Sequence, residues 1–276
     1  MLVSFVVVEY NSLEDIARCV ESIRGIGDLQ HEIIVSSNSL YPEAEQKRLE
    51  EAYPDVRWVF NPRNGGFAYA MNAGLAVARG NLMAITNPDC VFRSGLGEMA
   101  AFLAEHPGLG AIAPRIVDSD GVLQDSAREY VTPWRFIKRQ AERVLRHKEV
   151  VATHGMDYSR VQTADWVIGA FILVTRRAYE LTGGLSDDYF MYAEDLDWCT
   201  RIRKAGLEIC YYPEAEIQYK GTRSARHSGK YLKIFLKSHL LYWRRFGWRA
   251  SSLPHRRELE AIVGWTRNKL SDVGVK

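Results

Sequence analysis

The sequence predicts an α/β fold in which a Rossmann-like, mostly parallel central sheet is flanked by helices and followed by a C-terminal basic helical segment. Three observations lead to this prediction. Short apolar runs alternate with helix-length segments through residues 3–86, the pattern of parallel strands joined by crossover helices. Polar residues follow each run, as at the ligand-binding edge of such sheets. Neither G-x-G-x-x-G nor G-x-x-x-x-G-K-S/T occurs, which disfavours a dinucleotide fold and a P-loop enzyme.

Four continuous apolar runs are expected to form strands that are buried on both faces of the sheet. They cover residues 3–8, 32–37, 56–60 and 82–86. Ser12 and Asp15 predict a capping box at the start of the helix that follows the first strand. A charged helix is expected over 42–53, and a third helix runs from a Gly-Gly pair to Gly80. Each strand is thus joined to the next by one helix.

The pattern becomes less regular after residue 89. Asp120 and Gly121 lie between short apolar runs and predict a hairpin. A calcium-binding loop is the poorer alternative, because its twelfth position is not Glu. Residues 166–184 predict a strand that leads into a helix ended by two glycines. A further strand is expected over 208–213, and a long basic, aromatic-rich helix over 229–248.

The composition is that of a globular protein from a reducing compartment. The chain has 276 residues, of which 47% are hydrophobic and 25% charged, enough for a sizeable core. Its four cysteines show no C-x-x-C spacing, so we expect reduced thiols and a cytoplasmic protein. The N-terminal apolar run is too short for a signal peptide, and no stretch approaches the roughly 20 apolar residues of a membrane span.

The net charge of +2 conceals two basic segments. Residues 220–257 contain eleven Lys or Arg and no acid, and residues 134–148 contain six against Glu142 alone. Such segments favour an anionic partner. No nucleic-acid-binding motif accompanies them, so we expect no nucleic acid partner.

The C-terminal basic segment allows two interpretations. In one, residues 134–148 and 229–257 contact an anionic membrane surface, with Trp243, Phe246 and Trp248 at headgroup depth. The protein would then be peripheral on the inner face of the cell membrane. In the other, the C-terminal helix packs on the domain and keeps its cations in water.

Small polar residues follow all four predicted parallel strands. They are Tyr10-Asn11, Ser37-Asn38, Asn61 and Asn87-Pro88-Asp89. Any one of them is explained by turn chemistry, since Asn and Asp stabilise loop starts. All four lie on the edge of the sheet where ligands bind, which favours a polar pocket. Asp89 is the acid here that could ligate a divalent cation, unless it caps a following helix.

A cluster of acids begins the segment YAEDLDWCTRIRKAG. Glu194 and Asp195 are adjacent, so repulsion between them would raise the basicity of whichever is the base. Asp197 lies four residues before Arg201, at the spacing of a helical ion pair. A solvated helix face is the alternative. Large apolar neighbours, Phe190 and Trp198 among them, favour a catalytic centre.

These residues resemble the family 2 glycosyltransferases of GT-A fold, and most closely the rhamnosyltransferase-type branch of bacterial polysaccharide synthesis. The resemblance covers roughly residues 3–225. The segments that carry it, in order, are VVVEYNS, NPRNGGFAYAMNAGLAVARGN, NPD, WVIGAFILVTRRAYELTGGLSDDYFMYAEDLDWCTRIRKAG, YYPEAEI and GTRS. It implies a GT-A domain over 1–225, with a nucleotide-sugar half of about 1–115 and an acceptor half of about 116–225, and a helical extension over 226–276.

The resemblance also implies roles for individual residues. Asp195 matches the general base, with Glu194 beside it in the acceptor site, and Asp89 matches the last acid of the metal-binding motif. With the strand ends, the nucleotide-sugar contacts expected are Tyr10, Asn11, Ser37, Asn38, Asn64, Gly65, Asn72, Asn87, Asp89, Gly169 and Ala170.

Two positions differ from the usual family pattern. Ser37 stands where relatives usually carry an Asp that contacts the nucleobase, and Tyr219 stands where many carry a His that serves the metal or diphosphate. Two expectations therefore remain for the group that neutralises the departing diphosphate. One is a divalent cation, Mn²⁺ or Mg²⁺. The other is that Lys220 and Arg223 neutralise the departing diphosphate.

The function expected from the resemblance is inverting transfer of a sugar, with rhamnose as a candidate. The donor would be a nucleoside-diphosphate sugar of dTDP or UDP type, and the acceptor a glycan or a lipid-linked sugar in surface-polysaccharide or cell-wall assembly. A catalytically degenerate sugar-nucleotide-binding protein is the alternative. A nucleotidyltransferase is disfavoured, because the N-terminus lacks a glycine- and lysine-rich phosphate loop.

Overall fold

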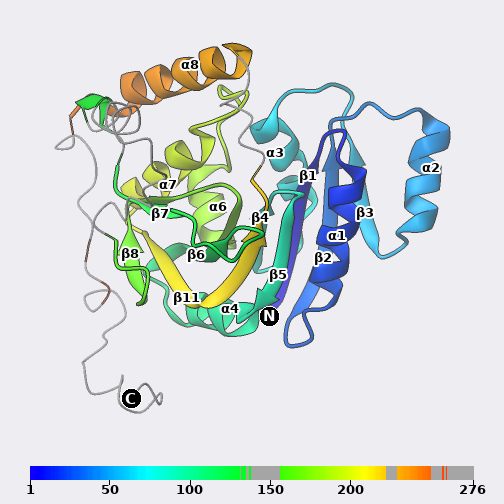
Figure 1. The fold of residues 1–276 in the computed structure, drawn as a ribbon, viewed down its shortest axis with the longest axis horizontal. Coiled ribbons are helices and arrows are strands. Elements are labelled where there is room, and N and C mark those ends of the chain that lie inside the picture. The colour runs from blue at the N-terminus through cyan, green and yellow to red at the C-terminus, as the bar shows by residue number, and fades with distance from the viewer. Residues whose placement is uncertain are drawn as a thin grey trace.

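The computed structural model describes residues 1–130, 132–134, 137, 156–221, 229–249, 257 and 259, with only the backbone at 229 and 230. Arg223 and nearly all of the basic segment 134–148 lie outside the described residues, as does most of 250–276. Figure 1 shows a central sheet covered by helices on both faces, with helix α8 across one end.

The first half of the sheet confirms the expected alternation. Its strands are β1 (Leu2–Glu9), β2 (Gln30–Ser37), β3 (Val56–Phe60) and β4 (Leu82–Thr86), all parallel, in the spatial order β3-β2-β1-β4. The connecting helices are α1 (Leu13–Arg24), α2 (Glu43–Ala52) and α3 (Phe67–Val77). Because these strands are parallel, their carboxyl ends lie on one edge of the sheet, at the top of Figure 1.

The second half of the sheet is mixed and continues in the order β4-β10-β6-β11-β5. Its strands are β5 (Cys90–Ser94), β6 (Leu109–Val117), β8 (Gln162–Ala164), β10 (Phe171–Thr175) and β11 (Glu208–Tyr219). Strand β10 is antiparallel to both neighbours, whereas β11 is parallel to β6 and antiparallel to β5 and β8. A separate small ribbon pairs β7 (Ala127–Arg128) with β9 (Trp166–Val167). Helix α4 (Leu96–Glu105) joins β5 to β6.

Two local expectations were wrong in part. Ser12 does precede α1, but its side chain makes no capping hydrogen bond, so the capping box is absent. Its hydroxyl instead accepts a hydrogen bond from the Tyr10 amide at 3.4 Å. The strand expected over 208–213 continues to Tyr219, past irregularities in its register with β6. The Asp120-Gly121 turn is confirmed, since the Gly121 amide donates to the Asp118 carbonyl at 3.1 Å.

The core consists of two apolar layers, one on each face of the sheet. Alternate side chains of β1 point to opposite faces, so Phe5 packs with α1 and α4, and Val6 packs with α3. The second layer is completed by α6 (Arg176–Thr182) and α7 (Glu194–Lys204). As expected, α6 ends at a left-handed glycine, Gly183.

Helix α8 (Gly229–Phe246) packs on the domain through one face. Tyr242, Trp243 and Phe246 are 0%, 6% and 7% exposed. The membrane interpretation placed Trp243 and Phe246 at headgroup depth, and it was wrong for these two, because both are covered by the protein. Trp248 is 53% exposed. Among the described residues, no helix combines the length and the apolar character that crossing a membrane requires.

Candidate active site at the carboxyl edge of the sheet

Three asparagines join the ends of β2 and β3 to the loop that begins α3. The side-chain Nδ2 of Asn61 donates to Asn38 Oδ1 at 3.1 Å, and the side-chain Nδ2 of Asn38 donates to the Gly66 carbonyl at 3.0 Å. Asn64 Oδ1 accepts from the Gly66 amide at 3.1 Å. Asn38 and Asn61 are buried, so their side chains fix this loop against the sheet. Polar side chains therefore do lie along this edge, as the sequence predicted. The side chains of Asn38 and Asn61 stabilise the turns that follow β2 and β3.

A buried acid at the end of β1, Glu9, was not singled out from the sequence. Its carboxylate accepts from the hydroxyls of Ser37 at 2.5 Å, Ser39 at 2.8 Å and Tyr41 at 3.1 Å, and from the Ser12 amide at 2.9 Å. Ser37 is 1% exposed, so its hydroxyl is committed to Glu9. A carboxylate therefore lies beside position 37, on the neighbouring strand, although position 37 itself is Ser. An acid directly after a buried apolar run was the signal in the sequence.

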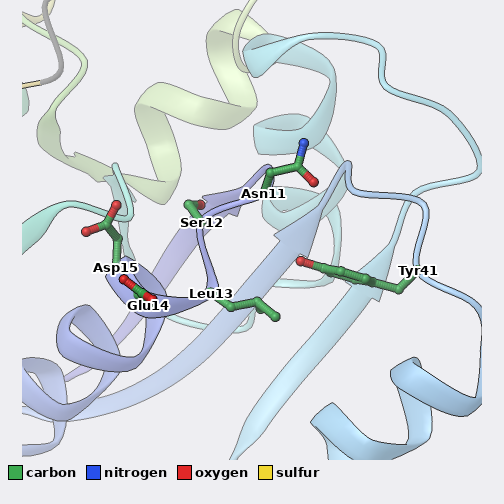
Figure 2. Close-up of a pocket in the computed structure, with 6 residues that line it drawn as sticks. All are labelled: Asn11, Ser12, Leu13, Glu14, Asp15 and Tyr41. Atoms are coloured by element: carbon green, nitrogen blue, oxygen red, sulfur yellow. The ribbon is translucent and has the colours of Figure 1, made fainter.

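A shallow pocket opens beside this cluster. Its volume is about 310 Å³, and its lining residues are Asn11, Ser12, Leu13, Glu14, Asp15 and Tyr41. Figure 2 shows the Tyr41 ring directed toward the loop that carries Asn11 and Leu13. Asn11 has a left-handed φ of 51°, which Asn tolerates better than most residues. Tyr10 beside it is 54% exposed.

The ends of β4 and β11 and the start of β10 meet at the middle of the edge. The Asn87 side chain donates to Tyr219 Oη at 3.2 Å, and the Asn87 amide donates to the Ala170 carbonyl at 2.9 Å. Asp89 Oδ2 accepts from the Gly221 amide at 3.1 Å. Asp89 leads into strand β5, so the helix-cap explanation for it was wrong. Burial, and then the charge of Asp89, raise the pKa of Tyr219 above its ordinary value, so its hydroxyl stays protonated.

Asp195 lies in the first turn of α7, and two backbone amides hold its carboxylate. The Gly169 amide donates to Oδ2 and the Leu196 amide to Oδ1, both at 2.8 Å. Burial raises the pKa of Asp195 above its ordinary value, and these two hydrogen bonds oppose that shift. The charge of Asp195 is also among the causes of the raised Tyr219 pKa. Because Gly169 lies just before β10, the carboxylate lies near the edge formed by β4, β10 and β11.

Glu194 is buried beside Asp195. The residue is only 7% exposed, and its Oε2 has no hydrogen-bond partner within the described chain. Burial, followed by the charge of Asp195, raises the pKa of Glu194 to about 8. The carboxyl group is thus mainly protonated at neutral pH, and the pair carries one negative charge instead of two.

The third acid, Asp197, has a structural role. It is fully buried and accepts from Arg201 Nε at 2.6 Å, Arg245 Nη1 at 2.9 Å and Tyr189 Oη at 3.1 Å. The expectation that Arg201 pairs with Asp197 at helical spacing is confirmed. Arg245 comes from α8, so this one carboxylate also joins α8 to α7.

The loop before α7 is anchored on two sides. The Phe67 amide donates to the Phe190 carbonyl at 3.0 Å, and Ser238 Oγ of α8 donates to the Met191 carbonyl at 2.8 Å. A Cβ added at Gly66 would lie 2.2 Å from that Phe190 oxygen, so only glycine allows this approach. The loop is thereby held between the start of α3 and α8.

The remaining expected residues are placed as follows. The Asn72 side chain donates to the Leu185 carbonyl at 2.8 Å and to Asp187 at 2.7 Å. Gly65 lies against the Tyr69 ring. Lys220 is exposed, next to Asp89, and its amide lies 3.4 Å from the Asp89 carbonyl oxygen.

The site offers one carboxylate where a metal is expected. Within the described ranges, no group of three or more His, Cys, Asp or Glu side chains could hold a metal ion. Magnesium-type ions are commonly bound by one or two carboxylates together with substrate phosphates. Asp89 therefore fits such an ion only when a diphosphate supplies the other ligands.

Comparison with solved structures supports the fold. A mannosyltransferase from Pyrobaculum calidifontis, solved with GDP-Man and Mn²⁺, superposes with a TM-score of 0.60 at 20% identity over 91% of this chain and 66% of that chain. GalNAc-T7, solved with UDP, GalNAc and Mn²⁺, gives a TM-score of 0.57 at 15% identity over 79% of this chain and 44% of that chain. Identities this low show a shared GT-A architecture and nothing about substrate.

Comparison of sequences identifies the family. An N-acetylglucosaminyl-diphospho-decaprenol L-rhamnosyltransferase from Mycobacterium tuberculosis is 27% identical over 277 aligned residues, which cover 88% of this chain and 85% of that protein. The family description "Glycosyl transferase family 2" matches residues 4–165, more than half of the chain. The chain therefore belongs to glycosyl transferase family 2 and is a glycosyltransferase of GT-A fold.

Proposed function

We propose that this enzyme is an inverting rhamnosyltransferase. It would move rhamnose from a dTDP- or UDP-linked donor to a lipid-linked sugar during surface-polysaccharide or cell-wall assembly, on the cytoplasmic side of the membrane. The observation that carries the proposal is the Asp195 carboxylate, fixed by the Gly169 amide at the edge where β4, β10 and β11 meet. Rhamnose and a lipid-diphosphate acceptor are supported by the name of the mycobacterial relative.

Asp195 is the proposed general base. In an inverting transfer the acceptor hydroxyl attacks the anomeric carbon from the face opposite the leaving nucleotide, and a carboxylate takes its proton. Two amide hydrogen bonds orient the Asp195 carboxylate, and its raised pKa makes it a stronger base than an exposed aspartate. Protonated Glu194, buried beside Asp195, leaves the negative charge on Asp195.

The nucleotide is proposed to lie along the ends of β1 and β2. The pocket between Tyr41 and the Asn11–Leu13 loop is wide enough for part of a nucleoside, and exposed Tyr10 lies beside it. Asn64 and Gly65, at the start of α3, would contact the base or ribose. Glu9 would act indirectly, since its hydrogen bonds set the positions of Ser39 and Tyr41.

The departing diphosphate is proposed to lie over the end of β4. Asp89 would hold a divalent cation together with the diphosphate oxygens, and the cation would neutralise the charge that develops there. The Tyr219 hydroxyl is protonated and accepts from Asn87, so its own proton can be donated to a phosphate oxygen. Lys220, and Arg223 from outside the described residues, would add positive charge.

Gly169 and Ala170 are proposed to form the floor beneath the donor sugar. Both precede β10, and the Ala170 carbonyl accepts the Asn87 amide. Gly169 has no side chain and binds Asp195 directly. This arrangement would place the donor sugar next to the base.

The test compares Asp195→Asn with the unmodified enzyme in two assays. Transfer is measured with dTDP-rhamnose and a lipid-diphosphate-linked N-acetylglucosamine acceptor. Donor binding is measured as the rise in melting temperature across dTDP, UDP and GDP sugars. We expect transfer to fall roughly a thousandfold or more while the thermal shift persists, because the base acts on the acceptor. Asp120→Asn, in an exposed turn, is the control and should leave both assays unchanged.

Two results would contradict the assignment. Unchanged transfer by Asp195→Asn would show that the base lies elsewhere. Loss of transfer and donor binding together would show that Asp195 is structural. A thermal shift without transfer in the unmodified enzyme, over every acceptor tried, would favour a protein that binds sugar nucleotides without catalysis.

A further inference from the structure

The outer face of α8 carries an apolar stripe that no described element covers. Leu232, Leu236 and Leu240 are 50%, 42% and 43% exposed. They are spaced four residues apart, so they form one line along the helix. The opposite face of α8 packs on the domain through Tyr242 and Phe246. Figure 1 shows α8 on the outside of the molecule, at the end toward which the parallel strands point.

Cations flank this stripe. Lys233, Lys237 and Arg244 are exposed on α8, which contains no Asp or Glu. Within the part of the chain that the structure describes, no ion pair involves these three side chains. Trp248, directly after the helix, is 53% exposed. An apolar line bordered by cations and an exposed Trp is the composition of a helix that lies in a lipid interface.

We propose that α8 binds an anionic lipid surface, with Leu232, Leu236 and Leu240 among the acyl chains and the cations at the headgroups. Charge complementarity favours lipid over a second copy of this chain, because a symmetric pairing through this face would bring Lys233 and Lys237 of both copies together. This surface is separate from the buried aromatic residues that the sequence first suggested, since Trp243 packs inward.

The inner face of α8 relates this surface to the active site. Ser238 Oγ donates to the Met191 carbonyl, and the rings of Phe235 and Tyr192 meet edge to face at 5.5 Å. The same loop leads directly into Asp195. A bilayer under α8 would therefore lie next to the acceptor side of the site, a consequence that rests on the proposed lipid-linked acceptor.

The test is sedimentation of the full-length protein with lipid vesicles, without sugar nucleotide or acceptor. Vesicles of phosphatidylcholine alone are compared with vesicles that also contain phosphatidylglycerol. We expect binding to the anionic vesicles only, and a roughly tenfold or greater loss of partitioning in Leu232→Gln/Leu236→Gln and in Lys233→Gln/Lys237→Gln. All four residues are exposed, so both variants should fold, which circular dichroism and thermal melting verify.

Matched controls lie far along the chain from α8. Val77→Gln changes a partly exposed apolar residue on α3, and Lys47→Gln changes an exposed cation on α2. Both should sediment like the unmodified protein. Absence of binding to anionic vesicles, or binding that the α8 variants do not weaken, would overturn the proposal. So would a change from dimer to monomer in the leucine variant, which would make this face a contact between copies. Because no donor is present, failure here leaves the proposed transfer reaction untouched.

Discussion

The backbone amide of Gly169 donates a hydrogen bond of 2.8 Å to Oδ2 of Asp195, 26 residues further along the chain. This contact joins the segment before β10 to the first turn of α7. It brings the expected floor of the donor site and the expected base together, and it fixes the direction of the carboxylate.

Gly169→Ala should slow transfer with little effect on stability. A Cβ at this position would lie 3.3 Å from Asp195 Cβ, so the carboxylate must shift by a few tenths of an ångström. Misplacement of a reacting group by about 1 Å can cost roughly a hundredfold, so this smaller shift should lower kcat by roughly three- to tenfold. Steady-state kinetics check the change, with Gly27→Ala as the control, since a Cβ there meets nothing within 4 Å. An unaltered kcat for Gly169→Ala would show that the geometry of this bond is unimportant.

Glu194→Gln should make stability less dependent on pH. Burial raises the pKa of Glu194 in the folded protein from 4.5 to about 8. The folded state therefore binds more protons than the unfolded state between these values, and unfolding becomes easier as the pH rises through that window. Below it both states are protonated, so this penalty is absent, and above it the penalty is complete.

Thermal melting of both proteins across this pH range measures the effect. The unmodified enzyme should lose melting temperature relative to Glu194→Gln as the pH rises, and the difference should level off above the folded pKa. A difference that stays constant across the window would mean that Glu194 is ionised in the folded enzyme.

Asp197→Asn should be strongly destabilising. The carboxylate is 0% exposed and lies between two guanidinium groups, those of Arg201 and Arg245. Removing one partner from a buried ion pair typically costs about 3 kcal/mol, because the remaining charge is uncompensated. Denaturant unfolding measures this loss. Glu45→Gln breaks an exposed helical pair with Arg48 and should change the unfolding midpoint little. Equal, small changes in both variants would show that the Asp197 network contributes little.

Removal of divalent metal should weaken donor binding. The only acid of the described chain at the end of β4 is Asp89, which fits an ion that the donor diphosphate also ligates. We expect EDTA to abolish most of the thermal shift given by the nucleotide sugar, and Mn²⁺ to restore it. In Asp89→Asn, the nucleotide sugar should raise the melting temperature only slightly, whether or not metal is present. If EDTA has no effect while Lys220→Gln removes the shift, cationic side chains have replaced the metal.

The sequence by itself determined the local elements and the contacts within them. Apolar runs of strand length specified β1 to β4, because a strand that is covered by helices on both faces is apolar on both faces. The pairing of Asp197 with Arg201 followed from a spacing of four, which helical geometry turns into contact. Gly183 ended α6 as expected, because a left-handed residue without Cβ is the favoured helix terminus.

The tertiary structure decided the contacts between residues far apart in the chain. The carboxylate of Glu9 meets Ser37 across 28 residues, and the Gly169 amide meets Asp195 across 26. The sequence also did not determine which side of α8 is buried, since Trp243 and Trp248 are equally apolar and only Trp243 is covered. The physical reason is that periodicity constrains neighbours along one element. Contacts between elements depend on how the whole set of apolar faces packs at once.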